Sequence, residues 1–583
     1  MARNLLRTAT LVILVATVCG CLVTPMPPDL VGDTATATPE ALATVAPTST
    51  PSAGAAGIGD PYFPAMGNGG YDVQRYLLDL EVDVAANTIA GTATIHALAT
   101  EDLSRFHLDF VGPALGEVTV GGVPADADRV DGELVITPAE PLAAGQAFTA
   151  TVAYSGLPGA HRAEGDARYS RGWHHYGEGI LVASEPTGAA SWYPVNDHPL
   201  DKAPYTMRIT VPEPYVVAAN GVLVGVEEGD GLRTYHWEED NPMASYVATV
   251  GIAEFERVEA GEAAGVPIRN YFPVNLPLSV REGYDRQGEM LTYFASLFGP
   301  YPFNAYGAMV HDDNLGFALE TQTLSLFGRG RPRENTVAHE LAHQWFGNSV
   351  SPAAWQHIWL NEGFATYAAN LWEEHAYGAE AASRAMFEYY RALAADQPRA
   401  TYTPGDLAGR LAALPLGERP VAPAAARRAL AALLGEALAP EEIDALIAAA
   451  GAGVSPRALP ALIAAAPAQR VTTGVSAYNA FVQASGLQEE TFVIGDPTPG
   501  LLFDSRVYVR GAMTLHALRA RVGDDTFFGI LRAYYARYAG GAASTDDFVA
   551  VAEEQSDEDL GAFFQSWLFE TALPPIPELG WEP

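Results

Sequence analysis

Hydrophobic and polar residues alternate with a period of two through much of the first half of the chain. Residues 77–84 read LLDLEVDV, with leucine or valine at every even position and an acidic residue at three of the odd ones. That period is typical of a strand with one buried face. Similar segments follow at short intervals, separated by Gly, Pro and Asn: TATIHALA, ELVITPA, FTATVAYSG and YTMRITVPEPYVVAANG. We therefore predict an all-β domain over residues 60–258.

The pattern changes from strands to helices after about residue 260. LTYFASLFGPYPF predicts a helix ended by Gly299-Pro300, and further helices are expected from about Asn335 to Gly347 and over WLNEGFATYAANLWEEH. Helical patterns with Asp and Ser at the caps continue to about residue 575. The expected fold class is α+β and multidomain, with an α-rich second domain built from residues 259–396 and 498–575.

Residues 397–497 interrupt this second domain with an alanine-rich block. It repeats ALIAAA at 445–450 and 461–466, with Pro and Gly between the repeats. We predict a helical insertion. Two interpretations stay open: a subdomain without chemistry, or a lid over an active site.

The N-terminus has the composition of a targeting segment followed by a linker. Two arginines precede a short apolar run, which ends in Val-Cys-Gly-Cys at residues 18–21. This resembles a lipoprotein signal peptide over residues 1–21, with Cys21 as the acylated residue; an ordinary secretory signal or an uncleaved anchor are the alternatives. Residues 22–58, rich in Pro, Thr and Ala, predict a disordered linker. The expected location is extracytoplasmic, with a lipid anchor in the cell membrane, or secreted.

Charge and cysteine content restrict the possible partners and ligands. The chain has 33 basic and 70 acidic residues, a net charge of −37, which disfavours binding to nucleic acid. Its two cysteines, Cys19 and Cys21, both lie in the targeting segment. A metal site in the folded part would therefore use histidine and carboxylate ligands.

A His-Glu-x-x-His motif lies in the sequence VAHELAHQWFGNSV. His339 and His343 are four residues apart, so on a helix both imidazoles leave the same face and can bind one ion, with Glu340 beside them. Glu362 follows nineteen residues after His343, on the next predicted helix. Two histidines and one glutamate would leave one position of a tetrahedral Zn²⁺ open, as in catalytic zinc sites. The alternative is that Glu362 is a solvated helix residue.

These residues, the LNEG around Glu362 and the downstream RVYVRGAMTLHAL resemble the zinc aminopeptidases of the aminopeptidase N family, gluzincin metallopeptidases. The likeness covers residues 60–570 apart from the alanine-rich block, and it points to a short bacterial, lipoprotein-like member. The resemblance implies a saddle-like N-terminal β-sheet domain and a thermolysin-like zinc peptidase domain. Many relatives continue into further domains, so we expect an open cleft here.

The resemblance also implies a role for individual residues. His339, His343 and Glu362 would bind one Zn²⁺, and Glu340 would be the general base. Tyr508 corresponds to the tyrosine of the family's Tyr-x-Lys-Gly motif, which stabilises the oxyanion.

The substrate-binding acids match the family less closely. Arg510 replaces the lysine of the tyrosine motif and keeps the charge. Glu320 would bind the substrate's free amine, although Phe317, Leu319 and Thr321 replace the expected Gly, Met and Asn of that motif. Glu185, in ASEPTGAASWYP, resembles the acid of the β domain that joins the amine site; a surface-loop acid is the alternative.

The implied function is a zinc-dependent aminopeptidase acting on peptides with a free N-terminus. A zinc-bound water would attack the first peptide bond, with Glu340 as base and Tyr508 on the oxyanion. Two alternatives remain: a thermolysin-like endopeptidase, which needs no amine anchor, and a catalytically silent, tethered peptide-binding protein.

Overall fold

The structure, a computed structural model, describes residues 50–161, 171–177, 179–396 and 492–583, together with positions 427, 441, 443–445 and 448. The predicted signal peptide, Cys21 and most of the predicted linker lie outside these residues, as does nearly all of the alanine-rich insertion. None of the helices in the described ranges is long and apolar enough to cross a bilayer.

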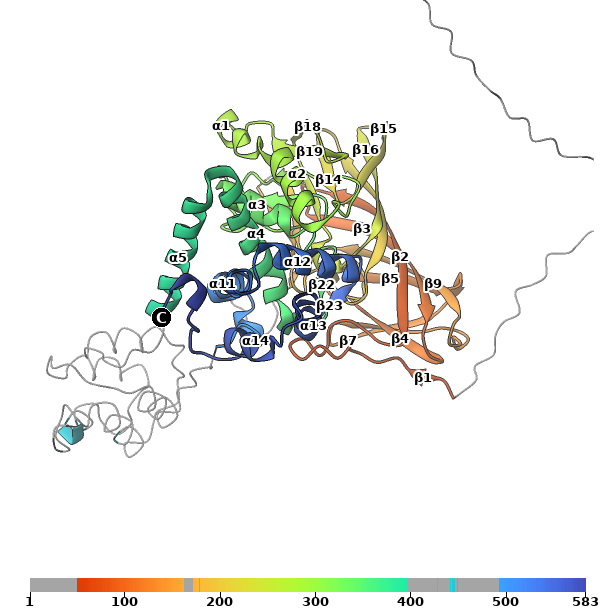
Figure 1. The fold of residues 1–583 in the computed structure, drawn as a ribbon. Helices are drawn as coiled ribbons and strands as arrows, with labels where there is room; N and C mark the ends of the chain where they lie inside the picture. Colours follow the sequence, from red (N-terminus) through yellow and green to blue (C-terminus); the bar gives the residue numbers. More distant parts are fainter. Residues whose placement is uncertain are drawn as a thin grey trace, which may run out of the picture. The chain divides into compact units, whose positions relative to one another are not determined.

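The N-terminal part is built on an eight-stranded, mostly antiparallel sheet (Figure 1). In spatial order its strands are β15 (Val222–Gly229), β16 (Leu232–Met243), β13 (Ala203–Pro212), β2 (Tyr71–Asp83), β3 (Thr88–Ala99), β9 (Ala147–Gly156), β5 (Ala114–Val120) and β6 (Val123–Pro124). In β2 the buried positions include Tyr76, Leu78, Leu80 and Val82, with more exposed residues between them. The alternation seen in the sequence therefore marks the face of the sheet that contributes to the core.

Two smaller sheets complete the β-rich part. One contains β10 (Ala160–His161), β11 (Arg171–Tyr176), β12 (Gly179–Ala183), β17 (Val250–Ala253) and β14 (Val216–Ala219). The other contains β1 (Ser52–Ala53), β4 (Leu103–Asp109), β8 (Glu133–Thr137) and β7 (Asp126–Val130). Strand β1 lies inside the predicted linker, where it pairs with β4 through its backbone. Both of its side chains are exposed, so no hydrophobic pattern marks it.

The second, C-terminal part begins with a sheet and continues as helices. The sheet contains β18 (Phe255–Ala263), β19 (Val266–Pro273), β20 (Ala308–Val310) and β21 (Ser325–Phe327). The helices are α1 (Leu278–Arg281), α2 (Gln287–Phe298), α3 (Glu334–Ala342), α4 (Trp359–Tyr377), α5 (Ala379–Asp396), α11 (Ser505–Val522), α12 (Asp524–Tyr538), α13 (Thr545–Ser556) and α14 (Gly561–Leu568). Strands β22 (Ser351–Pro352) and β23 (Ala542–Ala543) pair with each other. The α+β fold class is as predicted, but the strands continue to Pro273, past the predicted change at residue 260.

Two polar residues, the buried Asp60 and the half-buried Lys202, join the β-rich part to the loops around α3 and α4. Asp60 accepts hydrogen bonds from the backbone N–H groups of Tyr62 and Phe63, and its carboxylate lies 3.2 Å from His198 Nε2. It also accepts a hydrogen bond from the backbone N–H of Trp355 at 2.9 Å. Lys202 Nζ donates to the carbonyl oxygens of Asn348, Ser349 and Gly541 at 2.7–3.0 Å. Burial lowers the pKa of Lys202 to about 7. These bonds fix the loop that follows α3 against the β-rich part.

Candidate active site

Helix α3 carries the His-Glu-x-x-His motif and is shorter than predicted. It ends at Ala342, so His343 is its C-cap, and the chain reaches Gly347 through irregular turns. There the N–H groups of Asn348, Ser349 and Val350 donate to the carbonyls five residues earlier. Gly347 has φ +125°, and a Cβ at this position would lie 1.9 Å from Asn361 Oδ1. Only glycine therefore allows this turn to approach α4 so closely.

The predicted metal ligands meet between α3 and α4. The Nε2 atoms of His339 and His343 lie 2.9 Å apart, and Glu362 Oε2 lies 3.2 Å and 3.4 Å from them. Ligands about 2.0–2.1 Å from a tetrahedral ion are roughly 3.3–3.4 Å from one another. The three donor atoms are therefore spaced as one small tetrahedral cation requires, and two imidazoles with one carboxylate suit zinc.

The pKa shifts of His339 and Glu362 fit a metal site, whereas the surrounding carboxylates raise the pKa of His343, so a bound cation would displace the proton of that imidazole. Burial lowers the pKa of His339, which favours the neutral imidazole that binds metals. Burial disfavours the carboxylate of Glu362, but the two imidazoles outweigh this effect and hold its pKa at about 2. Glu362 is thus an ionised ligand although it is only 3% exposed.

Two polar residues that the sequence analysis did not identify orient the imidazoles. Asn361 Oδ1 lies 2.8 Å from His343 Nδ1, and Thr366 Oγ1 lies 3.4 Å from His339 Nδ1. Because each contact is made by Nδ1, the Nε2 atom of each histidine is left to face the ligand cluster. Metal-binding histidines are usually oriented in this way by a hydrogen bond at their other ring nitrogen. Asn361 precedes Glu362 in the LNEG motif, and Thr366 follows it by one helical turn; their side-chain types alone do not distinguish them from solvated helix residues.

Helix α11 brings Tyr508 to the same cluster by packing closely on α4 (Figure 1). Gly511 and Gly363 meet at the crossing, where a Cβ on Gly363 would lie 2.8 Å from Gly511 Cα. The Tyr508 ring stacks on His339, with ring centroids 6.0 Å apart. Burial, with the nearby Glu362, raises the pKa of Tyr508 well above its usual value. The phenol is therefore protonated and able to donate a hydrogen bond.

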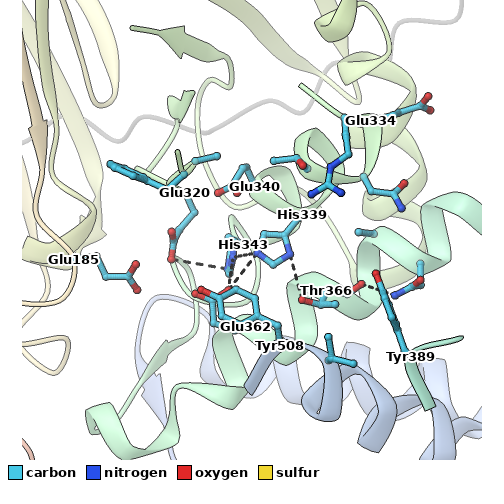
Figure 2. Close-up of a pocket in the computed structure, with 18 residues that line it drawn as sticks. Glu185, Glu320, Glu334, His339, Glu340, His343, Glu362, Thr366, Tyr389 and Tyr508 are labelled. Carbon is cyan, nitrogen blue, oxygen red and sulfur yellow. Dashed lines mark hydrogen bonds and ion pairs between the residues drawn. The ribbon is translucent and has the colours of Figure 1, made fainter. Parts of the chain in front are cut away.

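Three further acids lie beside the ligands, as Figure 2 shows. Carboxylate oxygens of Glu185, Glu320 and Glu362 lie within 4.8 Å of one another. Asn361 Nδ2 donates to Glu320 Oε1 at 3.1 Å, which ties this acid to the residue that orients His343. Glu340 is buried next to His339, and burial raises its pKa well above the usual value. All the predicted site residues except Cys21 line one cavity of about 500 Å³.

Arg510, which replaces a lysine of the tyrosine motif, does not line this cavity. Its guanidinium donates to five carbonyl oxygens at the end of α14 and just beyond it, those of Ser566, Trp567, Glu570, Thr571 and Ala572. In this structure the residue holds the C-terminal segment on α11. The charge retained at this position therefore serves the fold.

The chain combines a β-rich domain with a helical domain. The helical domain contains a buried set of two histidines and one glutamate, with an adjacent glutamate and a facing tyrosine. This combination defines a zinc metallopeptidase. Two family models match the chain: the Peptidase M1 N-terminal domain over residues 72–247, and the Peptidase family M1 domain over residues 284–402 and 484–567. The chain belongs to peptidase family M1, the aminopeptidase N family. The predictions of the family and of a zinc cofactor are confirmed.

Several curated relatives are aminopeptidases. Aminopeptidase M1 of Arabidopsis thaliana is 28% identical over 51% of this chain and 37% of its own length. Endoplasmic reticulum aminopeptidase 1 of Homo sapiens is 28% identical over 40% of this chain and 27% of its own. Leucyl aminopeptidase of Saccharolobus solfataricus is 30% identical over 33% of this chain and 26% of its own length. The chain thus spans about a quarter to two-fifths of the length of these relatives.

Solved structures match over a larger share of both chains. The M1 zinc metallopeptidase of Deinococcus radiodurans is 26% identical, with a TM-score of 0.69 over 90% of this chain and all of that one. A Glu-to-Ala mutant of that protein, bound to a Tyr-Ser-Ala substrate, is 27% identical with a TM-score of 0.68. The match covers 89% of this chain and 99% of that one. The N-terminal β-rich domain and helical catalytic domain of this chain are therefore the two-domain M1 fold.

Proposed function

We propose that this protein is a zinc-dependent aminopeptidase that removes the N-terminal residue from peptides. The observation that carries the proposal is the placement of Glu185 and Glu320 within 4.8 Å of the metal ligand Glu362. Two acids beside the metal site can hold the ammonium group of a peptide's first residue, which places the first peptide bond at the metal. The aminopeptidase relatives support the same activity.

The chain's own residues supply the proton transfers and part of the charge stabilisation. When bound to His339, His343 and Glu362, zinc lowers the pKa of water and polarises a carbonyl. Glu340 accepts the proton of the attacking water and returns it to the leaving amine; a neighbouring dication favours the carboxylate form that this role needs. The Tyr508 hydroxyl donates to the carbonyl oxygen as negative charge develops there, an interaction type worth about 3–4 kcal/mol.

An endopeptidase would use the same ligands without the amine-binding acids. In this site an N-acetylated peptide would leave Glu185 and Glu320 facing an uncharged group, and its first bond would have no ammonium contact to position it. The bound Tyr-Ser-Ala substrate of the Deinococcus radiodurans structure is consistent with the short, free peptides that we propose as substrates.

The decisive experiment is a panel of aminoacyl p-nitroanilides and their N-acetyl counterparts, assayed with and without a zinc chelator. We expect hydrolysis of the free compounds only, lost on chelation and restored by Zn²⁺. Equal rates on acetylated compounds would identify an endopeptidase. The matched variant Glu340→Gln should keep its zinc and lose turnover; retained turnover would exclude Glu340 as the base, whereas an inactive wild type would favour a silent binding protein.

We further propose that the mature protein is extracytoplasmic and anchored through a lipid on Cys21. The support is the sequence alone: the short apolar run ending in two cysteines, followed by a linker rich in Pro, Thr and Ala. Metabolic labelling with palmitate tests this. Label that persists in Cys21→Ala would contradict the assignment.

A further inference from the structure

The active-site cavity extends beyond the metal ligands, away from the acids assigned to the substrate amine. In Figure 2, Glu185 and Glu320 lie on one side of the two histidines, and Thr366 and Tyr389 lie on the other. Arg333, which immediately precedes α3, also lines the cavity. It is the one basic residue among the described lining residues that is not a histidine, in a cavity lined by five glutamates.

The guanidinium of Arg333 has no hydrogen-bond or ion-pair partner within the described ranges. The nearest acid in sequence, Glu334, is engaged elsewhere. Its carboxylate accepts hydrogen bonds from Arg286 at 2.5 Å, Trp372 Nε1 at 2.7 Å and Tyr377 OH at 2.6 Å. In a chain with 70 acidic and 33 basic residues, an arginine that lies in a binding cavity without a partner among the described residues is available for an anionic ligand.

Two further polar groups at this end of the cavity also lack hydrogen-bond partners in the part of the chain that the structure describes. No described residue hydrogen-bonds the Tyr389 hydroxyl; burial and the charge of Glu373 raise its pKa, and the charge of the nearby Arg333 acts in the opposite direction. Asn370 is only 4% exposed, yet its Oδ1 is buried without a hydrogen-bond partner, while its Nδ2 donates to the Thr366 carbonyl. A buried unpaired acceptor costs stability, so a ligand N–H is its natural partner.

Resting on the proposed aminopeptidase function, we propose that Arg333, Tyr389 and Asn370 form a subsite for the C-terminal carboxylate of a short peptide. Arg333 and Tyr389 would donate to the carboxylate, and Asn370 Oδ1 would accept from a peptide N–H. No side chain caps the N-terminus of the nine-residue α3, and its partial positive charge favours the same anion.

The reach of the site limits the length of this peptide. Arg333 precedes His339 by six residues, which is about 9 Å along a helix axis. One extended peptide residue spans about 3.3–3.6 Å. With the first peptide bond at the metal ligands, one or two further residues bring the terminal carboxylate to the arginine. The subsite therefore selects dipeptides and tripeptides.

The test compares three substrate arms that share one N-terminal residue X, chosen from the anilide panel: X-Ala-Ala, X-Ala-Ala-amide and X-Ala-Asp-amide. The readout is kcat/KM for release of X. In the wild type we expect the free acid to exceed the amide about tenfold or more, chiefly through KM, because charge-assisted hydrogen bonds of this kind contribute on that scale. Arg333→Met should bring the ratio near one, and Arg333→Lys should keep part of it.

Arg331→Met is the matched control, since Arg331 is exposed, lies 3.8 Å from Glu282 and does not line the cavity. This variant should keep the wild-type ratio. A ratio near one in the wild type, or one unchanged by Arg333→Met, would overturn the subsite. If kcat/KM on X-Ala-Asp-amide equals that on the free acid, the subsite does not require a C-terminal carboxylate. That result would overturn the proposal and show that the subsite accepts the carboxylate of an acidic side chain. Anilide hydrolysis by the wild type tests the proposed function separately, because the anilides carry no carboxylate.

Discussion

The crossing of α11 over α4 has no room for a side chain at either glycine. A Cβ on Gly511 would lie 2.8 Å from Gly363 Cα, and both contacting atoms belong to backbones. Carbon atoms pack best at about 3.5–4.0 Å. The substitution Gly511→Ala therefore requires the two helices to separate by roughly 1 Å, with an overpacking cost of about 1–3 kcal/mol.

This separation should reduce catalysis as well as stability. Tyr508 is on α11, three residues before Gly511, whereas Glu362 is on α4, so the phenol would move relative to the metal ligands. A displacement of about 1 Å can cost about 10²-fold in rate, equivalent to about 2.7 kcal/mol. We expect kcat on an aminoacyl p-nitroanilide to fall by about that factor while KM changes little, because Glu185 and Glu320 are on other elements.

Gly529→Ala in α12 is the matched control. A Cβ there meets nothing within 4 Å, so alanine should slightly stabilise the helix and leave kcat unchanged. Bound zinc is measured in both variants. Wild-type kcat in Gly511→Ala, or a loss of kcat in proportion to lost zinc, would refute the reasoning from Tyr508.

Three further predictions concern residues around the site and in the fold. Asn361→Ala removes the nearer of two partners of His343 Nδ1, the other being the Phe346 carbonyl, and should weaken zinc binding about 10–100-fold, measured by competition with a chelator; unchanged affinity would contradict the orienting role. Arg510→Met leaves five carbonyls without their donor and should lower the free energy of unfolding by at least about 3 kcal/mol in denaturant titration, with Arg510→Lys intermediate. Burial raises the pKa of Asp201 to about 7, so the folded state keeps a proton that the unfolded state releases above about pH 4. Stability should therefore fall as pH rises from about 4 to 7, by up to about 1.4 kcal/mol per pH unit, and Asp201→Asn should flatten this dependence of Tm; an equal slope in both proteins would count against it.

Strands were predictable from the sequence where they have one solvent-facing side. Strand β2 alternates because every second residue is exposed, and its pattern was recognisable. Strand β19 is buried at seven of its eight positions, so it shows no alternation, and the predicted boundary near residue 260 missed it. Strand β1 is held by backbone pairing and by hydrogen bonds of Ser52 and Ser104, which no hydrophobic pattern can reveal.

The site was predictable to the extent that spacing along helices determines it. His339 and His343 share a helix face, and Glu362 follows at the spacing of the family motif, so the structure brings them together as expected. Asn361 and Thr366 orient histidines of another helix, and Arg333 lies in the cavity only through the path of the chain; polar side chains of these types are common on solvated helices. Their roles emerge only from the packing of α3, α4 and α11.

The side chain of Asp60 has a practical consequence for making this protein. It closes the turn at Tyr62 and also accepts the N–H of Trp355, shortly before the helix that carries Glu362. Any N-terminal truncation for recombinant production should therefore stop upstream of residue 60. A protein that starts after residue 60 would lose the hydrogen bond between Asp60 and the Trp355 N–H, just before the helix that carries Glu362. Its metal loading could then be poor, and the low activity could be mistaken for that of an intrinsically weak enzyme.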